Sequence, residues 1–260
     1  MKTRLDKLLV ERGLTPSRER AQALILAGKV LVNEQKIEKA GASIDPDSAL
    51  RLLGEDLRYV SRGGLKLERA LEHWQIDLRD KVCLDVGAST GGFSDCMLQH
   101  GTARVIAIDT GYGQIDFKLR SDPRLRLLEK TNARYLKASD LGEPIDFIAM
   151  DVSFISATLV LPAVIRAASS SASTADESAE AVNRQIVVLV KPQFEAGREA
   201  VGKGGIVRDE AAQRAAITKV EAALLALGCT HTESIESPIL GGEGNREFLL
   251  HAVLADPANR

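Results

Sequence analysis

The segment VCLDVGASTGGFS, residues 82–94, decides the fold of this chain. Its first five residues are apolar apart from Asp85, which is typical of a buried strand, and a glycine-rich turn leads into a helical pattern. Such a turn lets the backbone approach a nucleotide-like ligand at the carboxyl edge of a sheet. The dinucleotide fingerprint requires glycine two residues after Gly87, where this chain has Ser89, and this mismatch weakens a dehydrogenase assignment. A tight turn without any ligand is the alternative.

The chain on both sides of this turn alternates short apolar runs with helical patterns. This alternation predicts an α/β fold with a doubly wound, mostly parallel sheet. We expect strands at 82–86, 104–108, 125–129, 146–150, 186–190, 230–236 and 247–254. We expect helices near 64–74, 91–100, 157–168 and 209–227.

Residues 1–58 follow a different pattern and predict a small α+β domain. Leucines at helical spacing are interrupted at 13–17, Ser17 can cap a second helix, and residues 30–32 are typical of a short strand. Residues 59–64, YVSRGG, are expected to link this domain to a larger one at 65–260. Within the larger domain, the Ser, Ala and Glu-rich residues 169–184 predict a flexible insertion.

Basic side chains cluster in the small domain, although the formal net charge of the chain is −2. A net charge so close to zero excludes a uniformly basic surface, but it is compatible with a local basic patch that binds nucleic acid. An ordinary solvated helix surface is the alternative. The predicted RNA-binding residues are Arg4, Lys7, Arg12, Arg18, Arg20 and Lys29, together with Arg62 in the linker.

Polar groups follow the next strands at the same edge of the predicted sheet. Asp109 ends the strand at 104–108, where an acid can accept hydrogen bonds from ribose hydroxyls, and Asn132 and Asp151 follow later strands. S-adenosylmethionine has a sulfonium and an amino group, so an acid-lined pocket suits it better than it suits a pyrophosphate. We therefore predict S-adenosylmethionine as the cofactor. The predicted cofactor-binding residues are Asp85, Gly87, Ser89, Thr90, Gly91, Gly92, Phe93, Asp109, Asn132 and Asp151.

Four charged residues could meet at this edge. Lys66 follows a glycine pair, Asp151 and Lys191 end apolar strands, and Glu247 opens the last strand. In methyltransferase sheets the last strand runs antiparallel to the others, so its beginning lies at the carboxyl edge. An unperturbed lysine is protonated at neutral pH, but a second lysine and partial desolvation would lower its pKa. We predict Lys66 as the base for a ribose 2′-hydroxyl, with Lys191 tuning it and orienting the oxygen. Each residue taken alone would be a surface charge or a salt bridge.

Two sets of motifs resemble known families. RLDKLL at 4–9, SRERA at 17–21 and GKVLVN at 28–33 resemble the small RNA-binding domain of a ribosomal small-subunit protein, pseudouridine synthases and tyrosyl-tRNA synthetases. The second set of motifs is GASTGGF at 87–93, DTGYGQ at 109–114, KTNAR at 130–134, DVSFIS at 151–156 and LVKPQFE at 189–195. This set resembles the TlyA family, often labelled haemolysin A, which joins that domain to an FtsJ/RrmJ-type methyltransferase domain.

The resemblance implies a Rossmann-like class I methyltransferase fold, whose seven-stranded, mostly parallel sheet has an antiparallel last strand. It implies 2′-O-methylation of cytidine in ribosomal RNA, with a Lys-Asp-Lys-Glu tetrad at Lys66, Asp151, Lys191 and Glu247. The insertion before Lys191 departs from the family pattern. The chain also stops soon after its last strand, without the longer C-terminal helix of members that modify both subunits. We therefore expect large-subunit (23S) RNA as the substrate, with small-subunit (16S) RNA as a second candidate.

Three other functions compete with this one. A methyltransferase for exocyclic amines would have an Asp/Asn-Pro-Pro-aromatic loop, where this chain reads DVSF at 151–154. A pore-forming haemolysin needs a membrane segment or a secretion signal, and neither pattern is present, so we expect a cytoplasmic protein without membrane contact. A non-enzymatic RNA-binding assembly factor is the third alternative. The three cysteines have no CxxC spacing, so we expect neither disulfides nor a bound metal.

Overall fold

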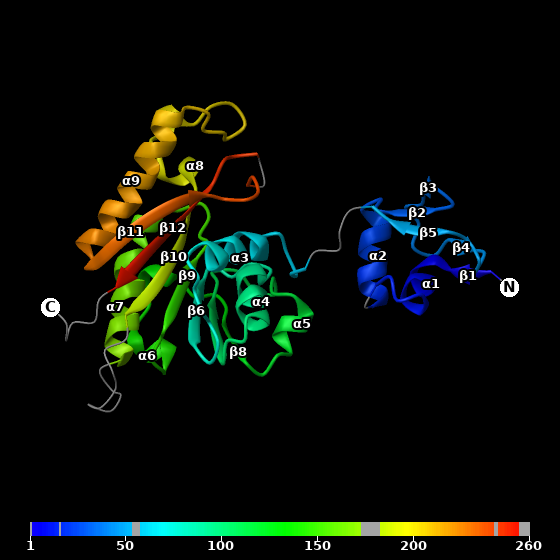
Figure 1. The fold of residues 1–260 in the computed structure, drawn as a ribbon, viewed down its shortest axis with the longest axis horizontal. Coiled ribbons are helices and arrows are strands. Elements are labelled where there is room, and N and C mark those ends of the chain that lie inside the picture. The colour runs from blue at the N-terminus through cyan, green and yellow to red at the C-terminus, as the bar shows by residue number, and fades with distance from the viewer. Residues whose placement is uncertain (1, 16, 54–57, 173–182, 242–243, 255–260) are drawn as a thin grey trace. The chain divides into compact units, whose positions relative to one another are not determined.

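The computed structural model describes residues 2–15, 17–53, 58–172, 183–241 and 244–254 (Figure 1). The chain separates into two compact units, Met1–Leu57 and Arg58–Arg260. Most of the predicted insertion, residues 173–182, lies outside the described residues. The flanking parts of that segment are regular, because residues 169–172 end a helix and Arg184 begins a strand.

The first unit packs two helices against small sheets. Strand β2 pairs antiparallel with both β3 and β5, and β1 pairs antiparallel with β4. Ser17 caps the second helix by accepting the Arg20 backbone N–H, as its sequence position predicts. Leu5, Leu9 and Ile25 form the centre of the core. The elements are β1 Thr3–Arg4, α1 Leu5–Glu11, α2 Arg18–Leu26, β2 Val30–Val32, β3 Gln35–Lys36, β4 Ser43–Ile44 and β5 Leu50–Leu52.

The second unit is built on a seven-stranded sheet in the order β11-β12-β10-β9-β6-β7-β8, which can be followed in Figure 1. Strands β10, β9, β6, β7 and β8 are parallel, and β12 runs antiparallel to both β10 and β11. The prediction of a mostly parallel sheet with an antiparallel last strand is confirmed. The strands are β6 Val82–Val86, β7 Arg104–Ile108, β8 Leu125–Leu128, β9 Phe147–Met150, β10 Arg184–Val190, β11 Cys229–Glu236 and β12 Phe248–Leu254.

Helices cover both faces of this sheet because successive strand side chains point to opposite sides. Cys83 belongs to a buried cluster that includes residues of α3 and α4, whereas the adjacent Leu84 belongs to a cluster that includes residues of α7 and α9. The helices are α3 Gly63–His73, α4 Gly92–Gln99, α5 Phe117–Arg120, α6 Ala138–Leu141, α7 Leu161–Ala172, α8 Pro192–Glu195 and α9 Glu210–Ala226. Short 3₁₀ helices occupy η1 Ala133–Tyr135, η2 Ala157–Leu159 and η3 Arg198–Ala200.

Two predictions need correction in this unit. Residues 59–64 do not form a free linker: Tyr59 is buried, the Val60 N–H donates to Asp95, and α3 begins at Gly63. The helix predicted at 157–168 is displaced, because residues 157–159 form a 3₁₀ turn capped by Ser156 before α7 begins. A proline at 162, in the first turn of α7, is compatible with a helix start.

Candidate functional site

The glycine turn after β6 brings the backbone close to the end of β9. Gly87 has a φ of +91°, and a Cβ built on it would lie 2.3 Å from the Asp151 carbonyl oxygen, so the position excludes a side chain. Ser89 also has a positive φ, of +51°. The Asp109 carboxylate holds the turn by accepting the N–H groups of Ser89 at 2.8 Å and Gly111 at 2.6 Å. The turn is therefore fixed by an acid on the neighbouring strand.

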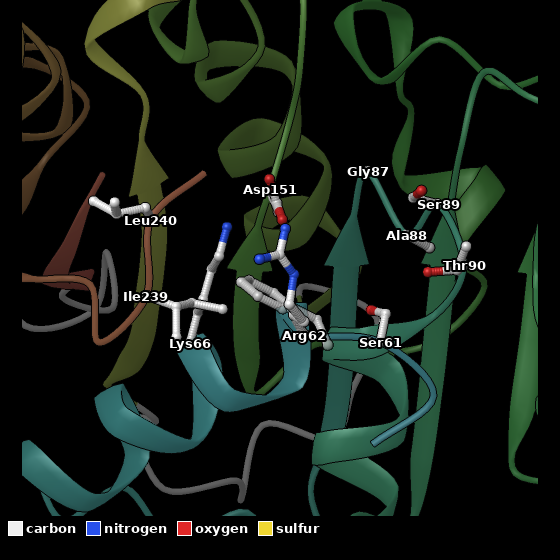
Figure 2. A pocket seen from close by; sticks show the side chains of 13 residues that line it. Ser61, Arg62, Lys66, Gly87, Ala88, Ser89, Thr90, Asp151, Ile239 and Leu240 are labelled. Atoms are coloured by element: carbon white, nitrogen blue, oxygen red, sulfur yellow. The ribbon is translucent and has the colours of Figure 1, made fainter. Parts of the chain in front are cut away.

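Two cavities open on either side of this turn. The first has a volume of about 230 Å³ and lies between the turn and the start of α3. Figure 2 shows the side chains of Lys66 and Arg62, from this part of the chain, reaching upward beside Asp151. Ile239 and Leu240 border the same cavity from the connection that precedes β12. The first cavity thus combines cations, a carboxylate and an apolar wall.

The second cavity has a volume of about 430 Å³ and lies along the carboxyl edge. Asp109 and Asn132 line it on one side, and the loop 151–155 lines it on the other. This volume falls within the range of roughly 300–1,000 Å³ that is usual for small-ligand sites. Carboxylates can accept hydrogen bonds from ribose hydroxyls and attract the positive charges of an amine or a sulfonium. The lining therefore fits S-adenosylmethionine.

Most of the predicted cofactor-binding residues line these cavities. Gly87, Ser89 and Asp151 border both, Thr90, Gly92 and Phe93 border the first, and Asp109 and Asn132 border the second. Asp85 and Gly91 border neither, which corrects their predicted direct contact. Asp85 is fully buried and accepts the Ser94 hydroxyl at 2.6 Å, and a Cβ on Gly91 would meet Leu119 at 2.3 Å.

Asp85 is nevertheless chemically unusual. Burial away from water raises the pKa of its carboxyl group to about 7, against the lowering effect of the Ser94 hydrogen bond. The carboxylates of Asp151 and Asp109 act in the same direction as burial. Asp85 is therefore a buried acid beneath the turn that holds its proton up to nearly neutral pH.

The four predicted catalytic residues assemble into two lysine–carboxylate pairs. Lys66 Nζ lies 2.5 Å from Glu247 Oε2, and Lys191 Nζ lies 2.5 Å from Asp151 Oδ1. Both lysine side chains are only 10% exposed, which strengthens their electrostatic interactions relative to water. Lys191 also donates to the Ser153 hydroxyl at 2.8 Å. The beginning of the antiparallel strand thus delivers Glu247 to the site, as its direction predicts.

The immediate partner of each buried lysine is a carboxylate, Glu247 for Lys66 and Asp151 for Lys191. Each carboxylate can therefore orient the amine that it contacts.

Two of the predicted RNA-binding residues of the first unit, Arg4 and Arg18, contact the buried acid Asp6. Arg4 donates to Asp6 through Nε at 3.0 Å and a terminal nitrogen at 2.9 Å, and Arg18 donates to the same carboxylate at 3.1 Å. The Gln22 amide donates to it at 2.8 Å. Both arginine side chains remain 52% exposed. These two guanidinium groups are fixed in place and still accessible to a ligand.

The other predicted RNA-binding residues have different settings. Lys7 lies 3.4 Å from Glu11 on the surface of α1, and Arg12 donates to the carbonyl oxygens of Pro46 and Ser48. Arg20 is half-buried on α2, and Lys29 is exposed just before β2. Arg62 lies in the second unit, where it borders the first cavity. Arg12 therefore supports a loop of the first unit as well as adding charge.

The sequence patterns did not predict several of the residues that line the two cavities. Ile239 and Leu240 follow no motif, and they reach the first cavity only because β11 turns back into β12. Phe154 lay inside a quoted motif, but nothing in the pattern indicated that its ring would be 92% exposed beside the second cavity. An exposed aromatic side chain at the rim of a cavity indicates a ligand-contacting residue, and this exposure can be seen only in the structure.

Two kinds of feature are absent from the described part of the chain. Among those residues, no group of three or more His, Cys, Asp or Glu side chains is arranged to hold a metal ion. Within the same ranges, no helix has the length and apolar character needed to cross a membrane.

Comparisons with known proteins agree with this geometry. The family model described as FtsJ-like methyltransferase matches residues 59–253, and the S4 domain model matches residues 3–49. A Mycobacterium tuberculosis protein named 16S/23S rRNA (cytidine-2′-O)-methyltransferase TlyA is 41% identical over 250 residues, which are 96% of this chain and 89% of that protein.

Two further proteins extend the comparison. The Campylobacter jejuni protein named 23S rRNA (cytidine-2′-O)-methyltransferase TlyA is 31% identical over 262 residues, covering 94% of this chain and 97% of its own. A solved structure of a Streptococcus thermophilus protein that bears a hemolysin name is 43% identical with a TM-score of 0.72. That match covers 98% of this chain and 89% of the other.

Proposed function

This chain belongs to the FtsJ-like methyltransferase family and contains an S4 domain, and from that premise we propose that it methylates a ribose 2′-hydroxyl of cytidine in ribosomal RNA. S-adenosylmethionine is the methyl donor. Large-subunit (23S) RNA is the proposed substrate, supported by the two TlyA relatives, whose names both include 23S and of which one also includes 16S. Ribosomal RNA as the substrate places the proposed reaction in the cytoplasm.

The observation that supports this proposal best is the pair of buried lysine–carboxylate contacts at the carboxyl edge. A ribose hydroxyl is a poor nucleophile, so its attack on a methyl group requires a proton acceptor and groups that orient the oxygen. Lys66 and Asp151 border the first cavity beside the glycine turn, and Lys191 and Glu247 hold them there. Such a set suits a hydroxyl acceptor.

The four residues take distinct roles in the proposed reaction. Lys66 accepts the 2′-hydroxyl proton, and Glu247 orients its amine. Lys191, held by Asp151 and Ser153, donates a hydrogen bond to the 2′-oxygen and fixes its position. When bound, S-adenosylmethionine supplies an electrophilic methyl group on a positively charged sulfur.

The first unit supplies affinity for RNA in this proposal. The Arg4 and Arg18 guanidinium groups are half-exposed and held by Asp6, so they can contact phosphate oxygens without further ordering. Phosphate contacts of this kind provide affinity and orientation but little sequence discrimination. The choice of nucleotide would then depend on the second unit.

Transfer of a radiolabelled methyl group to separated, unmethylated ribosomal subunits tests the proposal. We expect label on a cytidine ribose of the large subunit, located by mapping the modified nucleotide. Label on the small subunit alone would overturn the choice of subunit. Label on a base amine would overturn the proposed chemistry, and absence of transfer to either subunit would overturn methylation of ribosomal RNA.

A further inference from the structure

The loop after β9, residues 151–156, borders the second cavity and is anchored only in part by its own apolar side chains. Val152 and Ile155 pack against the core, whereas Ser153 and Phe154 are exposed. Phe154 also has a φ of +63°, a left-handed conformation that residues other than glycine rarely adopt. Contacts from outside the loop therefore help to hold it in this shape.

Glu195, the last residue of α8, contacts the far end of this loop. Its Oε2 accepts the Ser156 hydroxyl at 2.5 Å, and its Oε1 accepts the Ala157 backbone N–H at 2.6 Å. Lys219 on α9 lies 3.1 Å from the same carboxylate and donates to the Glu195 carbonyl oxygen at 2.9 Å. The Glu195 side chain is only 3% exposed, and a carboxylate buried this deeply persists only where such partners satisfy it.

The contacts of Glu195 complete a series between two segments. The loop 151–156 follows β9, and the segment 191–195 follows the neighbouring parallel strand β10. Lys191 contacts Asp151 and Ser153 near the start of the loop, and the rings of Phe154 and Phe194 lie 5.4 Å apart in its middle. Glu195 makes the last of these contacts, at the end of the loop. The segment 191–195 therefore contacts the loop 151–156 at its start, its middle and its end.

We propose that Glu195 is a positioning residue for the methyl-donor site: it holds the wall formed by residues 151–155 and thereby keeps Asp151 against Lys191. This inference rests on the proposed function in one respect: it assumes that the second cavity binds S-adenosylmethionine. Glu195 borders neither cavity itself and acts through the loop.

Calorimetric titration with S-adenosylmethionine tests this role without any RNA. The Glu195→Ala variant leaves the Ser156 hydroxyl and the Ala157 N–H without their acceptor, and we expect its Kd to rise about tenfold or more. At saturating S-adenosylmethionine, kcat for methyl transfer should remain reduced, because Asp151 is no longer fixed. The Glu195→Gln variant retains an acceptor for Ala157 and can donate to Ser156, so it should recover most of the wild-type affinity.

Two control variants separate positioning from general stability. Lys219→Ala removes the cationic partner of Glu195 but leaves both loop contacts, so it should lower Tm while its Kd stays within about twofold of the wild type. Arg184→Gln removes a buried side chain that binds the Ile145 carbonyl oxygen at the opposite end of β10. It should lower Tm without changing the Kd.

The outcomes distinguish this inference from the proposed function. Glu195→Ala with a lowered Tm but an unchanged Kd and kcat would overturn the positioning role. An equal loss of affinity in Arg184→Gln would also overturn it, since the effect would then be general. Absence of S-adenosylmethionine binding by the wild-type protein would instead contradict the assignment of the cavity on which both proposals depend.

Discussion

Asp6 in the first unit and Asp85 in the second are both fully buried aspartates, yet their surroundings differ completely. Hydrogen bonds from Arg4, and from Gln22 and Arg18, hold the pKa of Asp6 well below its ordinary value. Within the described ranges, the donors to Asp85 are the Ser94 hydroxyl and backbone, and burial raises the pKa of Asp85 to about 7. Among the described residues, its Oδ1 has no hydrogen-bond partner.

The difference shows how each unit uses buried charge. The first unit buries an anion so that two arginines stay fixed and half-exposed, which suits contact with a phosphate surface. The second unit buries the cations Lys66 and Lys191 beside its cavities, where low polarity strengthens their effect on a reacting group. Variants that remove one partner should therefore affect RNA binding in the first unit and chemistry in the second.

The largest effect is expected from removing either buried lysine. Lys66→Ala or Lys191→Ala should lower the rate of methyl transfer by about 10²–10⁴, because the proton acceptor or the oxygen-orienting group is lost. Single-turnover methylation with saturating S-adenosylmethionine measures this loss. Calorimetry should find cofactor binding largely intact in Lys66→Ala, because the partner of Lys66 is Glu247, which lies outside the loop 151–156. Lys137→Ala, an exposed lysine outside both cavities, is the matched control. Full activity of both buried-lysine variants would refute the mechanism.

The second effect concerns the arginine pair of the first unit. Asp6→Ala removes the common acceptor of Arg4 and Arg18, so we expect RNA affinity to fall roughly tenfold. Filter binding to a ribosomal RNA fragment at fixed salt gives this value. S-adenosylmethionine affinity, measured in parallel, should not change. A variant that binds RNA as tightly as the wild type would show that Asp6 serves folding alone.

The third effect is a contrast in the pH dependence of stability. Asp6 has a lowered folded-state pKa, so its contribution is present above the unfolded value of about 4 and is lost as the pH falls below it. Asp85 has a raised folded-state pKa, so stability declines as the pH rises from about 4 to about 7. Asp85→Asn should remove this decline, so its stability relative to the wild type should rise by about 2–3 kcal/mol between pH 5 and pH 8.

Denaturant unfolding at pH 5 and pH 8 measures that contrast. The wild type and Asp85→Asn should differ more at pH 8 than at pH 5. Equal differences at the two pH values would mean that Asp85 titrates at its ordinary value despite its burial. A pH dependence of the opposite sign would mean that Asp85 is held as a carboxylate.

The smallest effect is expected from an exposed cation of the first unit. Lys29→Ala should weaken RNA binding only modestly, and it should reduce the slope of log affinity against log salt by about one unit if Lys29 contacts a phosphate. Binding curves at several salt concentrations test this. An unchanged slope would remove Lys29 from the predicted contact set, whereas Arg18→Ala should change the slope in the same assay.

Local sequence patterns were enough to locate the strands of the large sheet, the glycine turn and the approximate positions of the four proposed catalytic residues. Apolar runs bounded by turn residues are local signals, and they located β6 and β7 to the residue. The alternation of strand and helix, with an antiparallel last strand, was enough to bring Glu247 to the same edge as Asp151 and Lys191.

The pairing of the charged side chains at the site could be determined only from the tertiary structure. Lys66 and Glu247 are separated by 181 residues, and their pairing depends on how α3 packs beside the start of β12. Tyr59 and Val60 looked like a linker because a short polar and glycine-containing segment has no periodicity, yet packing and Asp95 fix them to the second unit. Asp85 belonged to the motif but faces the interior. Contacts across long sequence separations leave no local pattern, because packing selects them only after the chain has folded.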